Sequence, residues 1–206
     1  MMVKRPFFLF ETGGYMQNQH AELYHLETER LTLRPVSAED KPMILRISSD
    51  PHTTEYLYFW GRIGATPESD ARRYLEYAVG RWKEKPRRAW EFCMALKETG
   101  EAVGIGSVEW VDGQPGTAEL GWILLPACRG KGYATEAARE LMRTAFEVLG
   151  ADTVIAHCDS RNLPSRKVME RLGMTLLGIA PEARPAKRPG ERNGDECTYA
   201  LARGMV

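Results

Sequence analysis

The chain has 206 residues, of which 43% are hydrophobic and 27% charged, a composition that is typical of a globular protein and excludes a disordered or fibrous one. Lysine plus arginine equals aspartate plus glutamate at 28 each, so no net field draws the protein to nucleic acid or to an anionic membrane. The four cysteines are scattered without a CxxC pair and no apolar run approaches the roughly 18 residues of a membrane span, so we expect a cytoplasmic protein with neither a metal site nor a disulfide scaffold.

Residues 1–24 show no hydrophobic periodicity and are predicted to be a flexible N-terminal extension. Residues 25–206 are predicted to form a single domain, because no internal repeat or second domain is recognisable in them. The first strand is predicted within Glu27–Val36, where Leu31 and Leu33 alternate with polar residues. The proline near its end limits this segment to an edge strand or a strand end.

Two helices are predicted from their N-terminal signals. Ser37 is a candidate N-cap with Asp40 three residues later, as in a capping box, ahead of an apolar stretch. Thr66 is a second candidate N-cap, and Pro67 occupies the first helical position. Residues 89–125 then contain two turn clusters between apolar runs, which predict three consecutive strands of an antiparallel meander.

The second half of the chain alternates helical and strand patterns. The loop over 181–195 is charged and rich in proline and glycine, so we expect it to be exposed and mobile. The whole order predicts an α/β (α+β) fold, with a mixed sheet of about six to seven strands and about four helices on its faces. The elements predicted here are a helix over 133–150, a strand over 153–159, a helix over 164–173, and strands over 174–180 and 196–202.

The stretch RGKGYA, residues 129–134, places two glycines and two cations between an apolar strand and a helix. Gly130 and Gly132 allow bare backbone N–H groups to face an anion, and the dipole of the following helix supports the negative charge. Arg129 and Lys131 would add cationic contacts, although a simple tight turn also explains such glycines. The patterns GxGxxG and GxxxxGKS/T are absent, so the motif favours a pyrophosphate from a carrier other than a dinucleotide or nucleoside triphosphate.

RGKGYA also matches the R/Q-x-x-G-x-G/A signature of the GNAT superfamily of acetyl-CoA-dependent N-acetyltransferases. The segments ETERLTLRPVSAED, AELGWILLPACRGKGYATEA and NLPSRKVMERLGM resemble successive landmarks of its RimJ/RimL-like branch, and the likeness runs from about Glu27 to Ala202. The resemblance implies a GNAT-type, mostly antiparallel central sheet that is splayed between the fourth and fifth strands. It also implies that acetyl moves from acetyl-CoA, a cosubstrate, to a primary amine by direct attack in a ternary complex.

The resemblance further implies which residues bind the cofactor. The strand before the turn lends backbone groups to the pantetheine arm and to the thioester carbonyl, which points to amides near Ile123, Leu124 and Leu125. Asn162 matches the family's N-x-x-S/A landmark and would contact the pantetheine. In this family the turn itself holds the coenzyme A pyrophosphate by backbone amides, which here belong to Arg129, Gly130, Lys131, Gly132, Tyr133 and Ala134.

Amine acetylation requires a group near the splayed strand that removes a proton from the amine. Glu119 lies on that strand and is the candidate base, acting through water, with an exposed or salt-bridged strand residue as its alternative; Glu109 is a second choice. Ser165 is the candidate acid for the leaving thiolate, with helix N-capping as its alternative. Where many family members carry a tyrosine acid, this sequence has Met169.

Other polar and aromatic residues are interpreted more plainly. His157 lies within an apolar strand and is predicted to be a satisfied or sheet-facing histidine rather than a catalyst. Tyr199 is predicted to be a core tyrosine. Tyr56, Tyr58 and Trp60 follow the first helix, where the family builds one wall of the acceptor cleft, although core packing explains these aromatics equally well.

Two alternatives to an enzyme remain open at this point: a non-catalytic acyl-CoA-binding module or sensor, and a nucleotide-binding protein. Within the enzyme hypothesis, the acceptor is a protein N-terminus or a small-molecule amine, because fold and superfamily do not fix the substrate. The oligomeric state is also open, with a homodimer as one option because dimers are common among relatives of the resembled branch.

Overall fold

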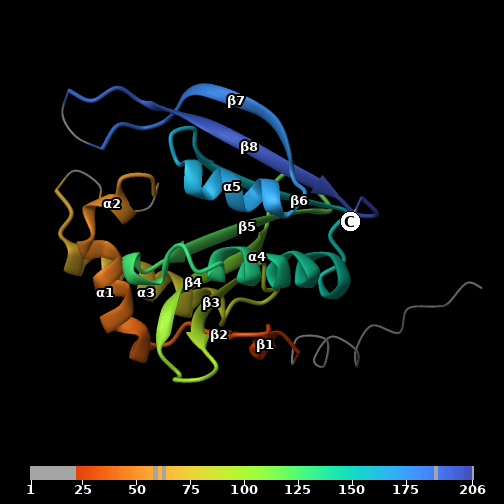
Figure 1. The fold of residues 1–206 in the computed structure, drawn as a ribbon, viewed down its shortest axis with the longest axis horizontal. Coiled ribbons are helices and arrows are strands. Elements are labelled where there is room, and N and C mark those ends of the chain that lie inside the picture. Colours follow the sequence, from red (N-terminus) through yellow and green to blue (C-terminus); the bar gives the residue numbers. More distant parts are fainter. Residues whose placement is uncertain (1–21, 58–59, 62–63, 188–189, 206) are drawn as a thin grey trace, which may run out of the picture.

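An eight-stranded sheet forms the centre of the fold (Figure 1). The computed structural model describes residues 22–57, 60–61, 64–187 and 190–205. In these residues the strand order is β1-β2-β3-β4-β5-β6-β8-β7, and every neighbouring pair is antiparallel except β5 with β6. The strands are β1 (Leu26–Glu27), β2 (Leu31–Pro35), β3 (Ala89–Leu96), β4 (Ala102–Trp110), β5 (Thr117–Leu124), β6 (Thr153–Asp159), β7 (Thr175–Arg184) and β8 (Gly194–Ala202).

The helices begin where the sequence signals place them. Ser37 and Asp40 form the predicted capping box before α1, and Thr66 accepts a hydrogen bond from the Ser69 amide at the start of α3. Figure 1 shows α4 crossing in front of the central strands, while α1, α2 and the tip of the β7–β8 hairpin share one side of the molecule. In the described part of the chain the α-helices are α1 (Lys41–Ser49), α2 (Pro51–Thr54), α3 (Pro67–Arg81), α4 (Tyr133–Arg143) and α5 (Leu163–Arg171).

The sheet opens between β5 and β6. These two strands pair in parallel only at their first residues, with Thr117, Ala118 and Glu119 opposite Thr153, Val154 and Ile155. Beyond this point β5 continues beside β4 alone and β6 beside β8. The predicted mixed sheet and its splay are therefore confirmed, and the strand beyond the expected six to seven is the two-residue β1.

The hydrophobic core fills the space between the sheet and the helices. Ile44 of α1, Phe92 of β3, Leu141 of α4 and Met169 of α5 are all completely buried. Leu23, which the sequence analysis assigned to the extension, is completely buried as well. The remainder of that extension, residues 1–21, lies outside the described residues. No helix in the described ranges combines the length and apolarity that crossing a membrane requires.

The connection between the last two strands is shorter than predicted. We expected an exposed loop over 181–195, but β7 continues to Arg184 and β8 already begins at Gly194. Most of the described residues of this segment are exposed as predicted, but Arg184 and Lys187 are half-buried. The error arose because proline and glycine suggested a loop, whereas the charged side chains find partners elsewhere in the fold.

Candidate active site

The turn that links β5 to α4 has the geometry of an anion cradle. Gly130 and Gly132 have φ angles of 75° and 85°, in the left-handed region that favours glycine. Across the described residues, no amide between Gly130 and Thr135 donates a hydrogen bond to a protein acceptor. These N–H groups are the orphan donors of a helix start, where the helix dipole is positive. The turn can therefore bind a phosphorylated ligand through its backbone.

Arg129 does not contribute to this cradle in the way we expected. Its amide donates to the Pro126 carbonyl at 3.2 Å. Its Nη2 lies 3.6 Å from Asp50 Oδ2, and it also donates to the Thr53 hydroxyl. The Arg129 amide is therefore engaged within the protein, whereas a phosphate contact by its exposed guanidinium stays a prediction. Lys131 is exposed and stays a candidate.

The open edge of β5 is the second part of the candidate cofactor site. The Leu125 amide donates to the Val103 carbonyl of the β4 side at 2.9 Å. Because backbone groups alternate in direction along an antiparallel pair, Ile123 also directs its amide toward β4. The prediction that the amides of Ile123 and Leu125 bind the pantetheine arm is corrected accordingly. Trp122 and Leu124 direct theirs into the gap toward β6, and Leu124 therefore stays a candidate.

A cavity of about 310 Å³, here called the inner cavity, lies at the point where β5 and β6 separate. It brings together Glu119 of β5 with Asn162 and Ser165 at the start of α5, which the sequence analysis had selected separately. Glu109 of β4 also lines it and stands directly opposite Glu119 in the sheet. The remaining walls are mostly aromatic and aliphatic side chains, together with four polar residues that were not candidates from the sequence: Glu91, Ser107, His157 and Arg184.

His157 and Glu119 form a hydrogen-bonded pair in this cavity. The distance from His157 Nδ1 to Glu119 Oε1 is 3.0 Å. The hydrogen bond to Glu119 raises the pKa of His157 above its ordinary value, and burial opposes that effect only in part. His157 is thus a satisfied histidine, as one of its interpretations predicted, and it also lines the inner cavity. A carboxylate that holds an imidazole in a cavity is a recurrent arrangement for moving protons.

Glu91 is the most deeply buried acid of the inner cavity. It accepts a hydrogen bond from the Tyr74 hydroxyl at 2.7 Å, and burial raises its pKa to about 8. Burial and then the neighbouring charge of Glu119 raise the pKa of Glu109 as well. An acid inside the buried strand pattern AWEFCMAL was the sequence signal that could have identified Glu91.

Replacing Glu91 by glutamine is expected to remove a pH dependence of stability. With a folded pKa of about 8 against an ordinary value of 4.5, the folded state binds the extra proton between these values, so wild-type stability falls as pH rises through this window. The Glu91→Gln variant should gain stability relative to wild type by on the order of 2–4 kcal/mol from pH 5 to pH 9. Urea unfolding at several pH values measures the difference, and parallel pH curves would contradict it.

Asn162 and Ser165 have a structural role that accompanies their place in the cavity. The Asn162 side-chain oxygen accepts a hydrogen bond from the Ser165 amide at 3.2 Å and caps α5. Ser165 is therefore not the N-cap, which removes the alternative considered for it. Tyr199 is buried, and its hydroxyl accepts a hydrogen bond from Arg166 Nε at 3.2 Å, as the core interpretation predicted.

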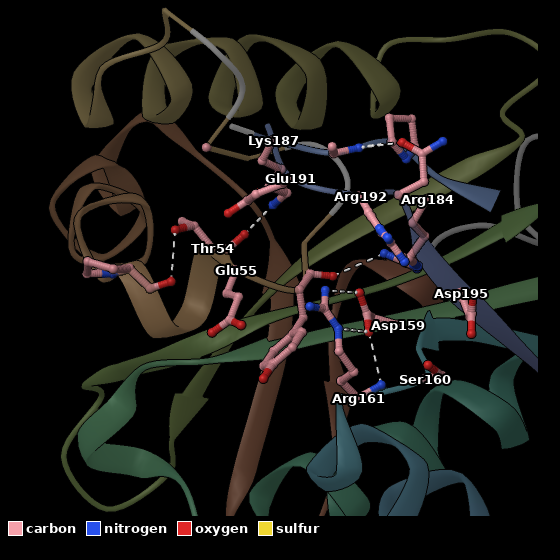
Figure 2. Close-up of a pocket in the computed structure, with 17 residues that line it drawn as sticks. Thr54, Glu55, Asp159, Ser160, Arg161, Arg184, Lys187, Glu191, Arg192 and Asp195 are labelled. Atoms are coloured by element: carbon pink, nitrogen blue, oxygen red, sulfur yellow. Dashed lines mark hydrogen bonds and ion pairs between the residues drawn. The ribbon is translucent and has the colours of Figure 1, made fainter. Parts of the chain in front are cut away.

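A second, outer cavity of about 780 Å³ lies between α2 and the β7–β8 hairpin. Figure 2 shows Lys187 reaching toward Thr54 on one side, and Arg161 meeting Asp159 on the other. Arg184 and Tyr56 line both cavities, so the two spaces adjoin. The Arg184 Nη1 donates to the Tyr56 carbonyl at 3.1 Å, which fixes this shared wall.

The ammonium of Lys187, in the β7–β8 connection, binds the segment that follows α2 and lines both cavities. It donates to the carbonyls of Thr54 and Leu57, and to that of Trp60 at 2.8 Å. Trp60 is only 2% exposed, so it belongs to the core and lines the inner cavity as well. Of the three aromatics considered for the acceptor cleft, Tyr58 lies outside the described residues.

Changing Lys187 to methionine is expected to destabilise the fold and loosen residues 54–57. Three carbonyls lose a charged donor, which costs about 1–3 kcal/mol, whereas Lys97→Met removes only a surface ion pair with Glu27 and should cost below about 1 kcal/mol. Urea unfolding gives the two costs, and amide hydrogen exchange reports on the segment. Equal effects of the two variants would show that the three-carbonyl contact stabilises nothing.

A sheet that splays beside the inner cavity, with an anion cradle after the open strand, is the arrangement expected of an acyltransferase. Residues 30–175 match the family model described as an acetyltransferase (GNAT) domain. The uncharacterized N-acetyltransferase p20 of Bacillus licheniformis is 32% identical over 162 residues, which cover 79% of this chain and 88% of p20. The chain belongs to the GNAT acetyltransferase family, and its class of activity is N-acetyl transfer.

Solved structures agree with this assignment. The crystal structure of a GNAT-family acetyltransferase from Bacillus anthracis has a TM-score of 0.71 and 28% identity, covering 86% of this chain and 98% of that one. Mycobacterium smegmatis RimJ, in complex with CoA-disulfide, has a TM-score of 0.73 at 20% identity and covers 87% of each chain. The latter likeness concerns the fold, and it places a RimJ protein among the structural neighbours.

Proposed function

We propose that this protein transfers acetyl from acetyl-CoA to a primary amine by direct attack in a ternary complex. The observation that carries the proposal is the Glu119–His157 pair, 3.0 Å apart. The pair lies at the point where β5 and β6 separate and the edge of β5 becomes open. The turn whose free amides can bind phosphate, here called the phosphate turn (residues 130–134), follows the other end of that edge. One strand, β5, thus connects a place for the pyrophosphate with a place for proton removal.

The cofactor end of the site depends on the backbone. The amides from Gly130 to Ala134 bind the pyrophosphate of acetyl-CoA at the N-terminus of α4. The groups of Trp122 and Leu124 that face the gap bind the pantetheine arm as an added strand would. An amide of this edge also polarises the thioester carbonyl and stabilises the charge that develops on its oxygen. Asn162 and Ser165, on the β6 side of the gap, lie near the sulfur end of the arm.

The reacting amine binds in the inner cavity beside Glu119. Amines are mostly protonated at neutral pH, so Glu119, with His157 hydrogen-bonded to it, removes a proton directly or through water. The nitrogen lone pair then attacks the thioester carbon and an N–C bond forms; the nitrogen releases its second proton to solvent, the C–S bond breaks, and the thiolate leaves. Ser165 protonates the thiolate and regains a proton from solvent. The carboxylates of Glu109 and Glu119 favour approach of a cationic amine, and acceptor groups beyond the amine extend into the outer cavity.

Titration of the purified protein with acetyl-CoA in a calorimeter, followed by thiol release in the presence of amines, tests the function. We expect saturable binding and amine-dependent release of free coenzyme A. The amine panel contains short peptides with a free N-terminus, amino acids and α,ω-diamines. Binding without release for every amine would favour the sensor alternative. Absence of acetyl-CoA binding, or displacement of coenzyme A by ATP or NAD, would overturn the proposal.

A further inference from the structure

The phosphate turn is held by a residue from the other end of the sequence. Arg30, in the connection between β1 and β2, donates from Nη1 to the Lys131 carbonyl within the turn at 3.0 Å. Its backbone amide and its Nε each donate to the Glu136 carboxylate in the first turn of α4 at 2.7 Å. Its guanidinium carbon lies 4.7 Å from the centre of the Tyr133 ring. The Arg30 side chain therefore contacts Lys131 in the turn, and Tyr133 and Glu136 in the first turn of α4.

We propose that Arg30 is a positioning residue for the phosphate turn, which it holds in the orientation that presents the amides of Gly130–Ala134 to the pyrophosphate. The inference rests on the proposed function, because it concerns the site that acetyl-CoA would occupy. It also accounts for the segment ETERLTLR, which has no catalytic or cofactor role in the proposed mechanism. Thr28 of this segment likewise donates to Glu136, at 2.5 Å.

The phosphate turn needs a residue that fixes its conformation, because its own backbone is flexible. Two glycines give its backbone wide conformational freedom, and the amides that bind an anion are bonded to nothing else in the protein. Binding would otherwise have to order these residues, which costs conformational entropy. The bond from Arg30 to the Lys131 carbonyl fixes the peptide between the glycines before the ligand arrives. Pre-ordering of this kind raises affinity without adding a contact to the ligand.

A second arginine, the last residue of α4, provides a matched control. Arg143 forms ion pairs with Glu140 and Glu147 near the other end of α4. The side chains of Arg30 and Arg143 are 45% and 46% exposed, and both pair with glutamates of this helix. Arg143 does not contact the phosphate turn. Loss of either arginine therefore removes a similar surface ion pair, and only loss of Arg30 releases the turn.

The experiment compares Arg30→Ala with Arg143→Ala, using acetyl-CoA and S-acetyl-pantetheine as two ligands. Acetyl-pantetheine lacks the pyrophosphate and reports on the arm alone. We expect Arg30→Ala to weaken acetyl-CoA binding about tenfold, the size of a lost charge-assisted hydrogen bond, and to leave acetyl-pantetheine binding unchanged. Arg143→Ala should leave both unchanged. Arg30→Lys keeps the charge but not the forked geometry, and it should restore only part of the affinity.

The outcomes separate this inference from the proposed function. Unchanged acetyl-CoA affinity in Arg30→Ala, with normal binding by wild type, would overturn the role of Arg30 alone. An equal loss for both ligands would also overturn it, because that pattern indicates a general structural defect. A wild-type protein that binds no acetyl-CoA would overturn the proposed function and this role together.

Discussion

Changing Glu119 to glutamine is expected to lower kcat about 10²–10³-fold, within the range typical for loss of a general base. Glutamine keeps the size of the side chain and a hydrogen bond to His157, but it cannot accept the proton of the amine. The phosphate turn and the open edge of β5 remain, so the Kd for acetyl-CoA should be unchanged. Steady-state thiol release and calorimetry measure the two quantities. Glu101→Gln, at an exposed turn position, removes the same charge as a control.

The pH profile tells whether His157 works together with Glu119. Glu119 raises the pKa of His157, so the acidic limb of the kcat/KM profile should lie above the ordinary histidine value of about 6.5 in wild type. The limb should move to lower pH in Glu119→Gln, because the imidazolium loses its carboxylate partner. Unchanged rates in Glu119→Gln with every acceptor would remove Glu119 from the mechanism. An unmoved limb would remove His157 from the proton path.

Local signals in the sequence predicted the features that depend on a few consecutive residues. Thr66 with Pro67 starts a helix through its own side chain and ring, and Gly130 with Gly132 forms a turn through its own backbone freedom. Neither needs a distant partner, so pattern and propensity suffice. The order of such elements, together with the family resemblance, was then enough to predict the mixed sheet and its splay.

Features that depend on distant partners could not be predicted in this way. Arg129 precedes the turn as a phosphate-binding arginine would, but Asp50 lies close to its guanidinium from far away in the sequence. His157 looks like a sheet residue until Glu119 on the neighbouring strand is known. Lys187 belongs to a segment with the composition of a loop, and only the fold supplies the carbonyls that bury its ammonium. In each case the decisive partner is more than 30 residues away in sequence.

The direction of the backbone amides, which alternates along β5, could not be predicted from the sequence either. The sequence indicated which strand would lend its amides to the pantetheine arm, but not which of its residues face the gap. That choice depends on the register with β4, where the bond from Leu125 to Val103 decides the direction of every second amide. Because a shift of one residue exchanges the two sides of a strand, the candidates moved from Ile123 and Leu125 to Trp122, with Leu124 kept.

Replacing Gly130 by glutamate is expected to abolish measurable acetyl-CoA binding, with the Kd raised more than about 100-fold. A carboxylate at this position places a negative charge beside the amides that bind the pyrophosphate, and repulsion between close like charges costs about 1–4 kcal/mol in a partly exposed site. The new side chain also disturbs a backbone whose φ of 75° favours glycine. Calorimetric titration with acetyl-CoA measures the loss.

Gly113 makes it possible to separate the charge from the strain. Its φ is 74°, and a Cβ there, as at Gly130, would meet no atom within 4 Å. Both glycines are exposed, but Gly113 lies in the turn between β4 and β5, remote from the phosphate turn. Gly113→Glu should therefore lose a similar amount of stability, measured by urea unfolding, and retain wild-type affinity. If both variants lost affinity equally, strain and not the phosphate site would explain the effect; if Gly130→Glu bound acetyl-CoA normally, the pyrophosphate would have to lie elsewhere.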